Sequence, residues 1–109
     1  MDLLNELQNL TMQLRNSVKQ LRTNGIKLSE AEKEYKIAVN KKALLLRSED
    51  MPVTLISQVI YGYEDIAQLR FLRDSAEVIY KANQEAINTL KLQIRIIESQ
   101  IQREYGIND

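Results

Sequence analysis

The chain has no cysteine and no histidine. Without cysteine it can form no disulfide, zinc knuckle or thiol nucleophile, and without histidine it lacks the commonest general base and metal ligand. It also has no glycine-rich phosphate-binding loop, because Gly25, Gly62 and Gly106 stand alone. We therefore expect a protein that is not an enzyme and that carries no cofactor and no metal.

Glycine and proline are scarce, with three glycines and one proline in 109 residues. Average use is about 7% for glycine and about 5% for proline, so this scarcity favours long helices over many turns. No apolar run approaches the roughly 20 residues that cross a bilayer, and residues 1–14 do not form a signal peptide. We expect one domain, residues 1–109, in the cytoplasm and not in a membrane.

A seven-residue repeat runs along the first part of the chain. One position of the repeat holds Leu3, Leu10, Ser17, Asn24, Ala31, Ala38 and Leu45, and the other holds Leu7, Leu14, Leu21, Leu28, Tyr35 and Lys42. Such a repeat is typical of the seam of a coiled coil or helical hairpin, so we predict a helix over about residues 3–47. Ser17, Asn24 and Lys42 interrupt this seam.

Asn24-Gly25 is the ambiguous point of this helix. The pair often ends a helix, and Ser29 with Glu32 would make a capping box for a new one. The repeat nevertheless keeps its phase through the pair, which a loop would have no reason to preserve. We favour a continuous or gently kinked helix, weakened by about 1 kcal/mol at Gly25.

The second half of the chain predicts two further helices. Residues 48–52 are polar and end in Pro52, which disfavours helix just before it. A short amphipathic helix is expected over about 54–61, and a long one over about 64–105 with Gly106 as its C-cap. The apolar stripe of the long helix is Ile66, Leu69, Leu72, Ala76, Ile79, Tyr80, Asn83, Ile87, Leu90, Ile94, Ile97 and Ile101.

These elements predict an all-α fold of two long antiparallel helices, a helical hairpin or coiled coil, with a short connecting helix. Several apolar side chains fall outside both stripes: Leu4, Leu44, Leu46, Phe71, Val78, Leu92 and Ile96. They need cover from the short helix or from another chain. We therefore expect a homo-oligomer, most simply an antiparallel dimer that forms a four-helix bundle, while the choice between dimer and tetramer stays open.

The charges balance overall, with fifteen basic and fifteen acidic side chains. Locally, however, no acid lies between Glu6 and Glu30, whereas that stretch contains Arg15, Lys19, Arg22 and Lys27. The first three follow i, i+4, i+7 spacing and so form one stripe. This stripe is a solvated face, a contact for DNA or RNA phosphates, or a docking site for an acidic partner.

Two other groups of side chains are candidates for sites. Asp74 and Glu77 lie on one side of a helix, but a metal-binding bundle would normally add histidine, so we expect them to pair with nearby basic side chains. Tyr61 and Tyr63 flank Gly62; they would stack on bases, anchor an interface or cap the core. With Phe71 they are our candidate interface residues.

Several segments also carry a resemblance. They are Leu21 to Gly25, Ala31 to Ala38, Met51 to Ile56, Leu69 to Asp74, and Ala76 to Ala82 continuing into Glu85 to Ile87. Together they resemble a family of small, largely uncharacterised α-helical proteins from phages and prophages of Gram-positive bacteria. The likeness extends from about Leu7 to Tyr105, implies an origin in a bacterial host, and transfers no functional residues.

Two functions follow as expectations. The first is a non-enzymatic phage-type accessory protein, a helical scaffold that binds a host or phage protein and inhibits or modulates host machinery. The second is a nucleic-acid-binding accessory factor in phage replication or recombination, acting through the basic stripe.

Overall fold

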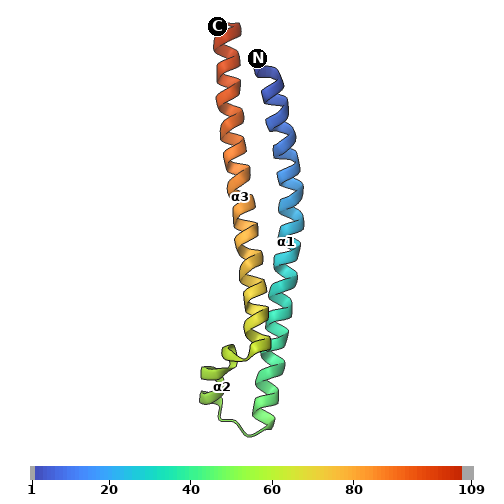
Figure 1. Cartoon of the computed structure of the whole chain (residues 1–109), viewed down its shortest axis with the longest axis vertical. Coiled ribbons are helices and arrows are strands. Elements are labelled where there is room, and N and C mark those ends of the chain that lie inside the picture. Colours follow the sequence, from blue (N-terminus) through green and yellow to red (C-terminus); the bar gives the residue numbers. More distant parts are fainter. Residues whose placement is uncertain (1, 107–109) are drawn as a thin grey trace. The chain divides into compact units, whose positions relative to one another are not determined.

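The computed structural model describes residues 2–106, nearly all of them helical. Helix α1 spans Leu3–Ser48, α2 spans Val53–Val59, a 3-10 turn η1 spans Ile60–Gly62, and α3 spans Glu64–Tyr105 (Figure 1). The two long helices pack against each other and are joined by the short one. The predicted all-α hairpin is therefore confirmed, and the end of the predicted short helix is the 3-10 turn.

The long helices have clear start and stop signals. The Asp2 carboxylate accepts a hydrogen bond from the Leu4 amide at 3.0 Å, which satisfies one of the unpaired donors of the first turn of α1. At the other end of the chain, Gly106 adopts a φ of +63° and its amide donates to the Gln102 carbonyl at 3.0 Å. This is the expected glycine C-cap of α3.

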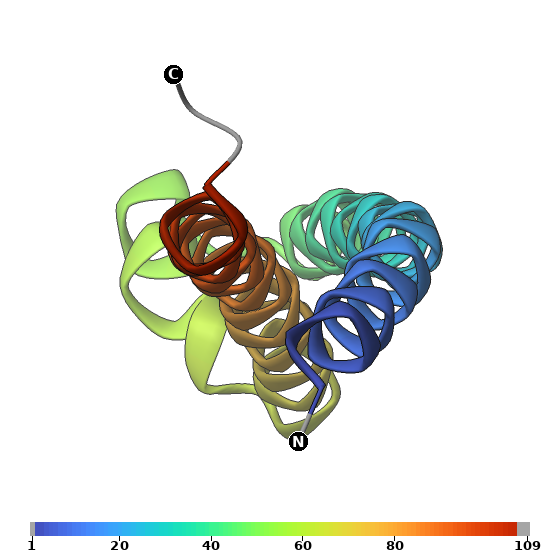
Figure 2. The ribbon, with the colours of Figure 1, turned by 90° about the horizontal axis from the view of Figure 1, so that it is seen from above.

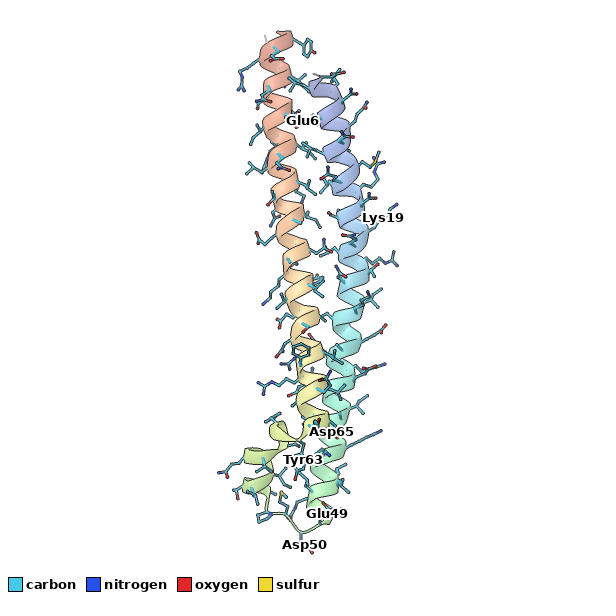
Figure 3. All side chains as sticks on the ribbon, viewed as in Figure 1. Glu6, Lys19, Glu49, Asp50, Tyr63 and Asp65 are labelled. Atoms are coloured by element: carbon cyan, nitrogen blue, oxygen red, sulfur yellow. The ribbon has the colours of Figure 1, made fainter. Side chains whose placement is uncertain are left out.

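The connection from α1 to α2 is a Schellman motif. The Met51 amide donates to the Leu46 carbonyl and the Asp50 amide to the Arg47 carbonyl, both at 3.1 Å. Asp50 is left-handed, with a φ of 67°, and lies at the turn in Figure 3. Met51 packs against the cluster that contains Leu46, which is the hydrophobic contact that accompanies this motif. The motif ends α1 close to the predicted position.

The chain divides into two compact units. The first is made of residues 2–23 and 80–106 among those described, and the second of residues 24–79. Helix α1 runs through Asn24-Gly25 without a break, as the phase of the repeat predicted.

In the first unit, the N-terminal part of α1 lies beside the C-terminal part of α3. Helix α3 contributes the buried side chains of Ile87, Leu90 and Ile97, together with Asn83. From α1, the half-buried side chains are those of the repeat: Leu3, Leu7, Leu10, Leu14, Ser17 and Leu21. The predicted seam is therefore the core of this unit.

In the second unit, three elements share the core. Leu46 of α1, Ile56 of α2 and Ile60 of η1 form a buried cluster, with Val39, Ala43, Met51 and Tyr63 packed around it. Ile66, in the first turn of α3, is only 1% exposed. Helix α2 covers one side of the unit, as Figure 2 shows.

Two details of the predicted stripes are wrong. Leu45 is 52% exposed, whereas Leu46, which we expected outside the stripe, is 4% exposed. The reason is that α3 begins only at Glu64, so the last turn of α1 packs against α2 and not against α3. The side of α1 that carries Leu46 is therefore buried, in place of the side that carries Leu45.

In α3, Leu72 and Ile79 are 46% and 56% exposed, although we placed both on the stripe. Arg73 is half-buried instead. The inward positions of α3 alternate in steps of three and four: 66, 69, 73, 76, 80, 83, 87, 90, 94, 97 and 101. Helical geometry thus overrides hydrophobicity at position 73, where the long arginine stem can lie along apolar surface.

Candidate interaction surfaces

The polar residues that interrupt the seam have specific partners. In the first unit, Asn83 is 8% exposed, and its side-chain amide Nδ2 donates to the Ser17 carbonyl at 3.0 Å. This hydrogen bond joins α3 to α1 at a position where the sequence showed only a defect. Buried polar pairs of this kind fix the register of packed helices.

Lys42, another seam defect, connects α1 to the start of α3 in the second unit. Its Nζ lies 3.0 Å from Asp65 Oδ2 and 4.8 Å from the centre of the Tyr63 ring. Figure 3 shows Tyr63 and Asp65 close together at this end of α3. The hydrogen bond from Lys42 holds the pKa of the Asp65 carboxyl below its usual range. The arrangement is a structural anchor.

Arg73 occupies the core-facing position that we assigned to Leu72. Its guanidinium stacks 4.6 Å from the centre of the buried Tyr35 ring and contacts Asp74 Oδ1 at 2.7 Å. The hydrogen bond to Asp74 raises the pKa of Arg73 above its ordinary value. Asp74 therefore pairs with a basic neighbour, as the sequence predicted. No cluster of three potential metal-ligating side chains occurs within residues 2–106.

The structure assigns the four basic candidates to different units. Arg15, Lys19 and Arg22 lie in the first unit, are exposed, and form no ion pair with any residue between 2 and 106. Figure 3 shows Lys19 on the side of α1 that faces away from α3. Lys27 belongs to the second unit.

One groove of the first unit is lined by residues of both long helices, so these residues lie on the same side of the unit. It is lined by Glu6 and Leu10 from α1 and by Gln93, Ile96, Ile97 and Gln100 from α3. Gln13 and Gln20 continue the line of Glu6 at seven-residue intervals. We call Glu6, Gln13, Gln20, Gln93 and Gln100 the amide flank.

The opposite flank of the first unit is basic. Side chains two residues apart on an α-helix point in directions that differ by about 200° around the helix axis, and so lie on nearly opposite sides. Arg15 and Arg22 lie two residues beyond Gln13 and Gln20, and Lys91 and Arg95 lie two residues either side of Gln93. We call these four, with Lys19, the cationic flank.

The basic stripe predicted from the sequence does not include Lys91 and Arg95, because they lie far from it in the chain. Both are exposed and, like the residues of the stripe, form no ion pair with any other residue from 2 to 106. Only the antiparallel packing of α3 on α1 brings them to the same side. The signal that could have found them is their position relative to the seam of α3.

The aromatic candidates have three different environments. Tyr63 is half-buried against the core of the second unit, under Lys42. Tyr61 is 46% exposed, and the Arg70 guanidinium lies 5.4 Å from its ring centre. Phe71 is 63% exposed. Tyr63 thus belongs to the core, while Tyr61 and Phe71 remain accessible.

Phe71 is part of a larger apolar surface on the second unit. On α1, Ile37 and Leu44 lie two residues before Val39 and Leu46, which pack at the α2 side, so they face the other side. On α3, Leu72 lies two residues beyond Arg70, which contacts Tyr61 next to α2. The side of the unit that α2 leaves open is therefore apolar.

We call this surface the apolar face. Its members are exposed to 46–71%: Ile37, Leu44, Phe71, Leu72, Val78 and Ile79. The face has one part on α1 and one part on α3. Glu34 and Lys41, two exposed residues of α1 that are seven positions apart, lie between these two parts. The face therefore combines apolar side chains with one negative and one positive charge, and Lys27, seven residues before Glu34, continues their line beyond the apolar residues.

Comparisons with known proteins add no further assignment: no protein-family profile, curated protein or solved structure matches the chain. Among the described residues, no helix has the length and apolar character needed to span a membrane.

Proposed function

We propose that the protein is a non-enzymatic helical interaction protein that associates with a second copy of itself through the apolar face. The observation that carries this proposal is the exposure of six large apolar side chains on one side of the second unit. Exposed apolar side chains gathered on one side and accompanied by polar ones are typical of protein–protein interaction sites. Two copies would complete the cover that a single hairpin lacks, as a four-helix bundle.

Charge on the apolar face favours a second copy as the occupant. In a dimer with a two-fold axis, the same surface of each protomer forms the contact. A favourable contact therefore needs each charge to lie against an opposite charge of the other protomer. With an axis between Glu34 and Lys41, antiparallel α1 helices would place Glu34 of each protomer against the partner's Lys41. The face is therefore self-complementary in both hydrophobicity and charge.

The scaffold would act in the cytoplasm of a bacterial host, as a phage-type accessory protein that modulates host machinery by binding. The two helices would then supply surface and not chemistry. The resemblance of the sequence to small phage and prophage proteins supports this setting, and the described residues hold no cluster of metal-ligating side chains that would favour catalysis.

The proposal is tested by sedimentation equilibrium over a wide range of protein concentration. We expect a dimer for the natural sequence, a monomer for Ile79→Glu, and an unchanged dimer for Met12→Glu. Met12 is the matched control because it is 62% exposed but lies in the first unit.

A charge swap tests the geometry of the dimer. Lys41→Glu should weaken association because it would place two carboxylates together, and the double variant Glu34→Lys with Lys41→Glu should restore it. A monomeric natural protein would contradict the proposal. Equal weakening by the single and double variants would contradict the antiparallel arrangement.

A further inference from the structure

We propose that the cationic flank of the first unit binds the phosphate backbone of a nucleic-acid duplex. This inference does not depend on the apolar face, which belongs to the other unit. It joins three basic side chains of α1 with two of α3 that the sequence stripe did not include. All five are exposed, and none forms an ion pair with another residue from 2 to 106.

The charge of the first unit is arranged unevenly around its axis. The cationic flank holds five basic side chains, and two acids lie on the same side: Glu98, seven residues after Lys91, and Glu85, which lines a groove with Leu21, Gln84 and Asn88. The amide flank holds four glutamines and one acid, Glu6. A solvated face with no binding role would normally alternate positive and negative charges to form pairs along the helix.

The spacing of the basic side chains suits a regular polyanion. Arg15, Lys19 and Arg22 rise along α1 by about 6 Å and then about 4.5 Å, at about 1.5 Å per residue. Lys91 and Arg95 form a second row on α3, whose axis lies about 8–10 Å from that of a packed neighbour. The Asn83–Ser17 contact and the groove between Leu10 and Gln93 set the register, so Lys91 and Arg95 lie beside the part of α1 that precedes Arg15. The five basic side chains therefore follow one another along the unit, which suits successive phosphates of a duplex.

The lack of aromatic side chains favours a duplex over a single strand. Single-stranded nucleic acid is normally held by stacking its bases on aromatic rings. The segment 2–23 has no aromatic residue, and the aromatic residues of 80–106 are Tyr80, which is half-buried, and Tyr105, at the end of α3. The flank therefore offers phosphate contacts without a surface for bases, which predicts binding without sequence preference.

Fluorescence anisotropy with a labelled DNA duplex tests the proposal on the full chain. Five phosphate contacts predict that the logarithm of the affinity falls with the logarithm of salt concentration with a slope of about −4.5. The triple variant Arg15→Gln, Lys19→Gln, Arg22→Gln should reduce this slope to about −1.8 and weaken binding at low salt. Glu98→Gln should strengthen binding.

A charge-matched control lies on the amide flank. Gln13→Glu, Gln20→Glu and Gln93→Glu lower the net charge by the same three units at exposed positions of similar helix propensity. This variant should bind the duplex nearly as well as the natural protein, and circular dichroism should show that both triple variants keep the helical fold.

Three results would overturn the inference. The first is absence of salt-sensitive duplex binding by the natural protein. The second is equal loss of affinity in the two triple variants, which would reduce the effect to net charge. The third is tighter binding of a polyglutamate chain or a single strand than of the duplex at the same salt concentration, which would assign the flank to an acidic polypeptide or to unpaired nucleic acid.

Discussion

The side-chain amide of Asn83 donates a hydrogen bond to the main-chain carbonyl of Ser17, with Nδ2 and O separated by 3.0 Å. Both residues occupy seam positions that would otherwise hold apolar side chains. The carbonyl can accept this bond because it has two lone pairs, of which the helix uses one. The contact thus joins two helices at a polar layer inside an otherwise apolar core.

This contact predicts a pH-sensitive variant, Asn83→Asp. At neutral pH a carboxylate oxygen would replace the amide donor that faces the Ser17 carbonyl, and we expect a loss of about 2–4 kcal/mol of stability. Burial would raise the pKa of this carboxyl in the folded state, so the neutral form is favoured by folding. The lost stability should therefore return below the pKa of the unfolded chain, about 3.9, and disappear again as pH rises through the folded pKa.

Thermal melting across acid and neutral pH measures this effect. Asn88→Asp is the control, because Asn88 is exposed on the same helix. Equal melting of the two variants at neutral pH would contradict the buried hydrogen bond.

The ion pair between Lys42 and Asp65 predicts a shallow acid transition. The hydrogen bond from Lys42 lowers the pKa of Asp65 in the folded state, so its contribution to stability is present above the unfolded pKa and is lost as pH falls through the folded pKa. Asp65→Asn should remove this part of the acid dependence below about pH 4. The effect should be small because Asp65 is 62% exposed.

Melting temperature as a function of pH between neutral and strongly acidic solution checks this. Glu104→Gln, on the exposed last turn of α3, should leave the acid limb of the curve unchanged. An unchanged acid limb in Asp65→Asn would mean that the ion pair has no energetic role.

The left-handed conformation of Asp50 predicts a stabilising substitution. A φ of 67° strains a residue that has a Cβ atom, and glycine removes this strain. Asp50→Gly should therefore raise the free energy of unfolding by about 1 kcal/mol. The neighbouring change Glu49→Gly should lower the free energy of unfolding, because Glu49 is not left-handed. Glycine at this position relieves no strain and only increases the backbone freedom of the unfolded chain. Urea denaturation of both variants tests this, and the same sign for both would refute the assignment.

The seam of α3 predicts a sharp contrast between two leucines. Leu90 is 8% exposed and Leu92 is 52% exposed, although they are two residues apart. Leu90→Asp should cost about 3–5 kcal/mol because it buries an unpaired charge, whereas Leu92→Asp should cost less than about 1 kcal/mol. Thermal or urea unfolding measures both. If Leu90→Asp melts like the natural protein, the phase of the seam is wrong.

The end of α1 provides the same test with adjacent leucines. Leu46 is 4% exposed within the cluster formed with α2, whereas Leu45 is 52% exposed. Leu46→Ala should cost about 2–5 kcal/mol and Leu45→Ala less than about 1 kcal/mol. The reverse order in urea denaturation would support the uninterrupted repeat of the sequence over the packing described above.

The helices were predictable because their signals are local. Scarce glycine and proline, together with Pro52 and Gly106, predicted the lengths and ends of α1 and α3, and the repeats of apolar residues predicted most of their inward sides. At Leu45 and Leu72 the prediction failed because inward orientation there depends on where the partner helix begins and on the strict phase of α3. Those facts arise from packing and are not contained in the hydrophobicity of one segment.

The candidate surfaces were predictable only in part for the same reason. The stripe of Arg15, Lys19 and Arg22 follows from spacing on one helix, and so does the surplus of apolar residues such as Phe71 and Val78. The contribution of Lys91 and Arg95 needs the register between two helices. The polar defects Ser17 and Lys42 were visible in the sequence, but their partners, Asn83 and Asp65, lie on the other long helix.

The division into two units also sets an order in which the chain can fold. The second unit is one unbroken stretch of sequence, whereas the first unit is made of the two ends of the chain. Closing the second unit brings together residues joined by a short connection, which needs little loop entropy. Once the second unit has folded, the residues that connect the two halves of the first unit are already ordered. The helices of the first unit can then pack progressively toward the termini at small further entropic cost.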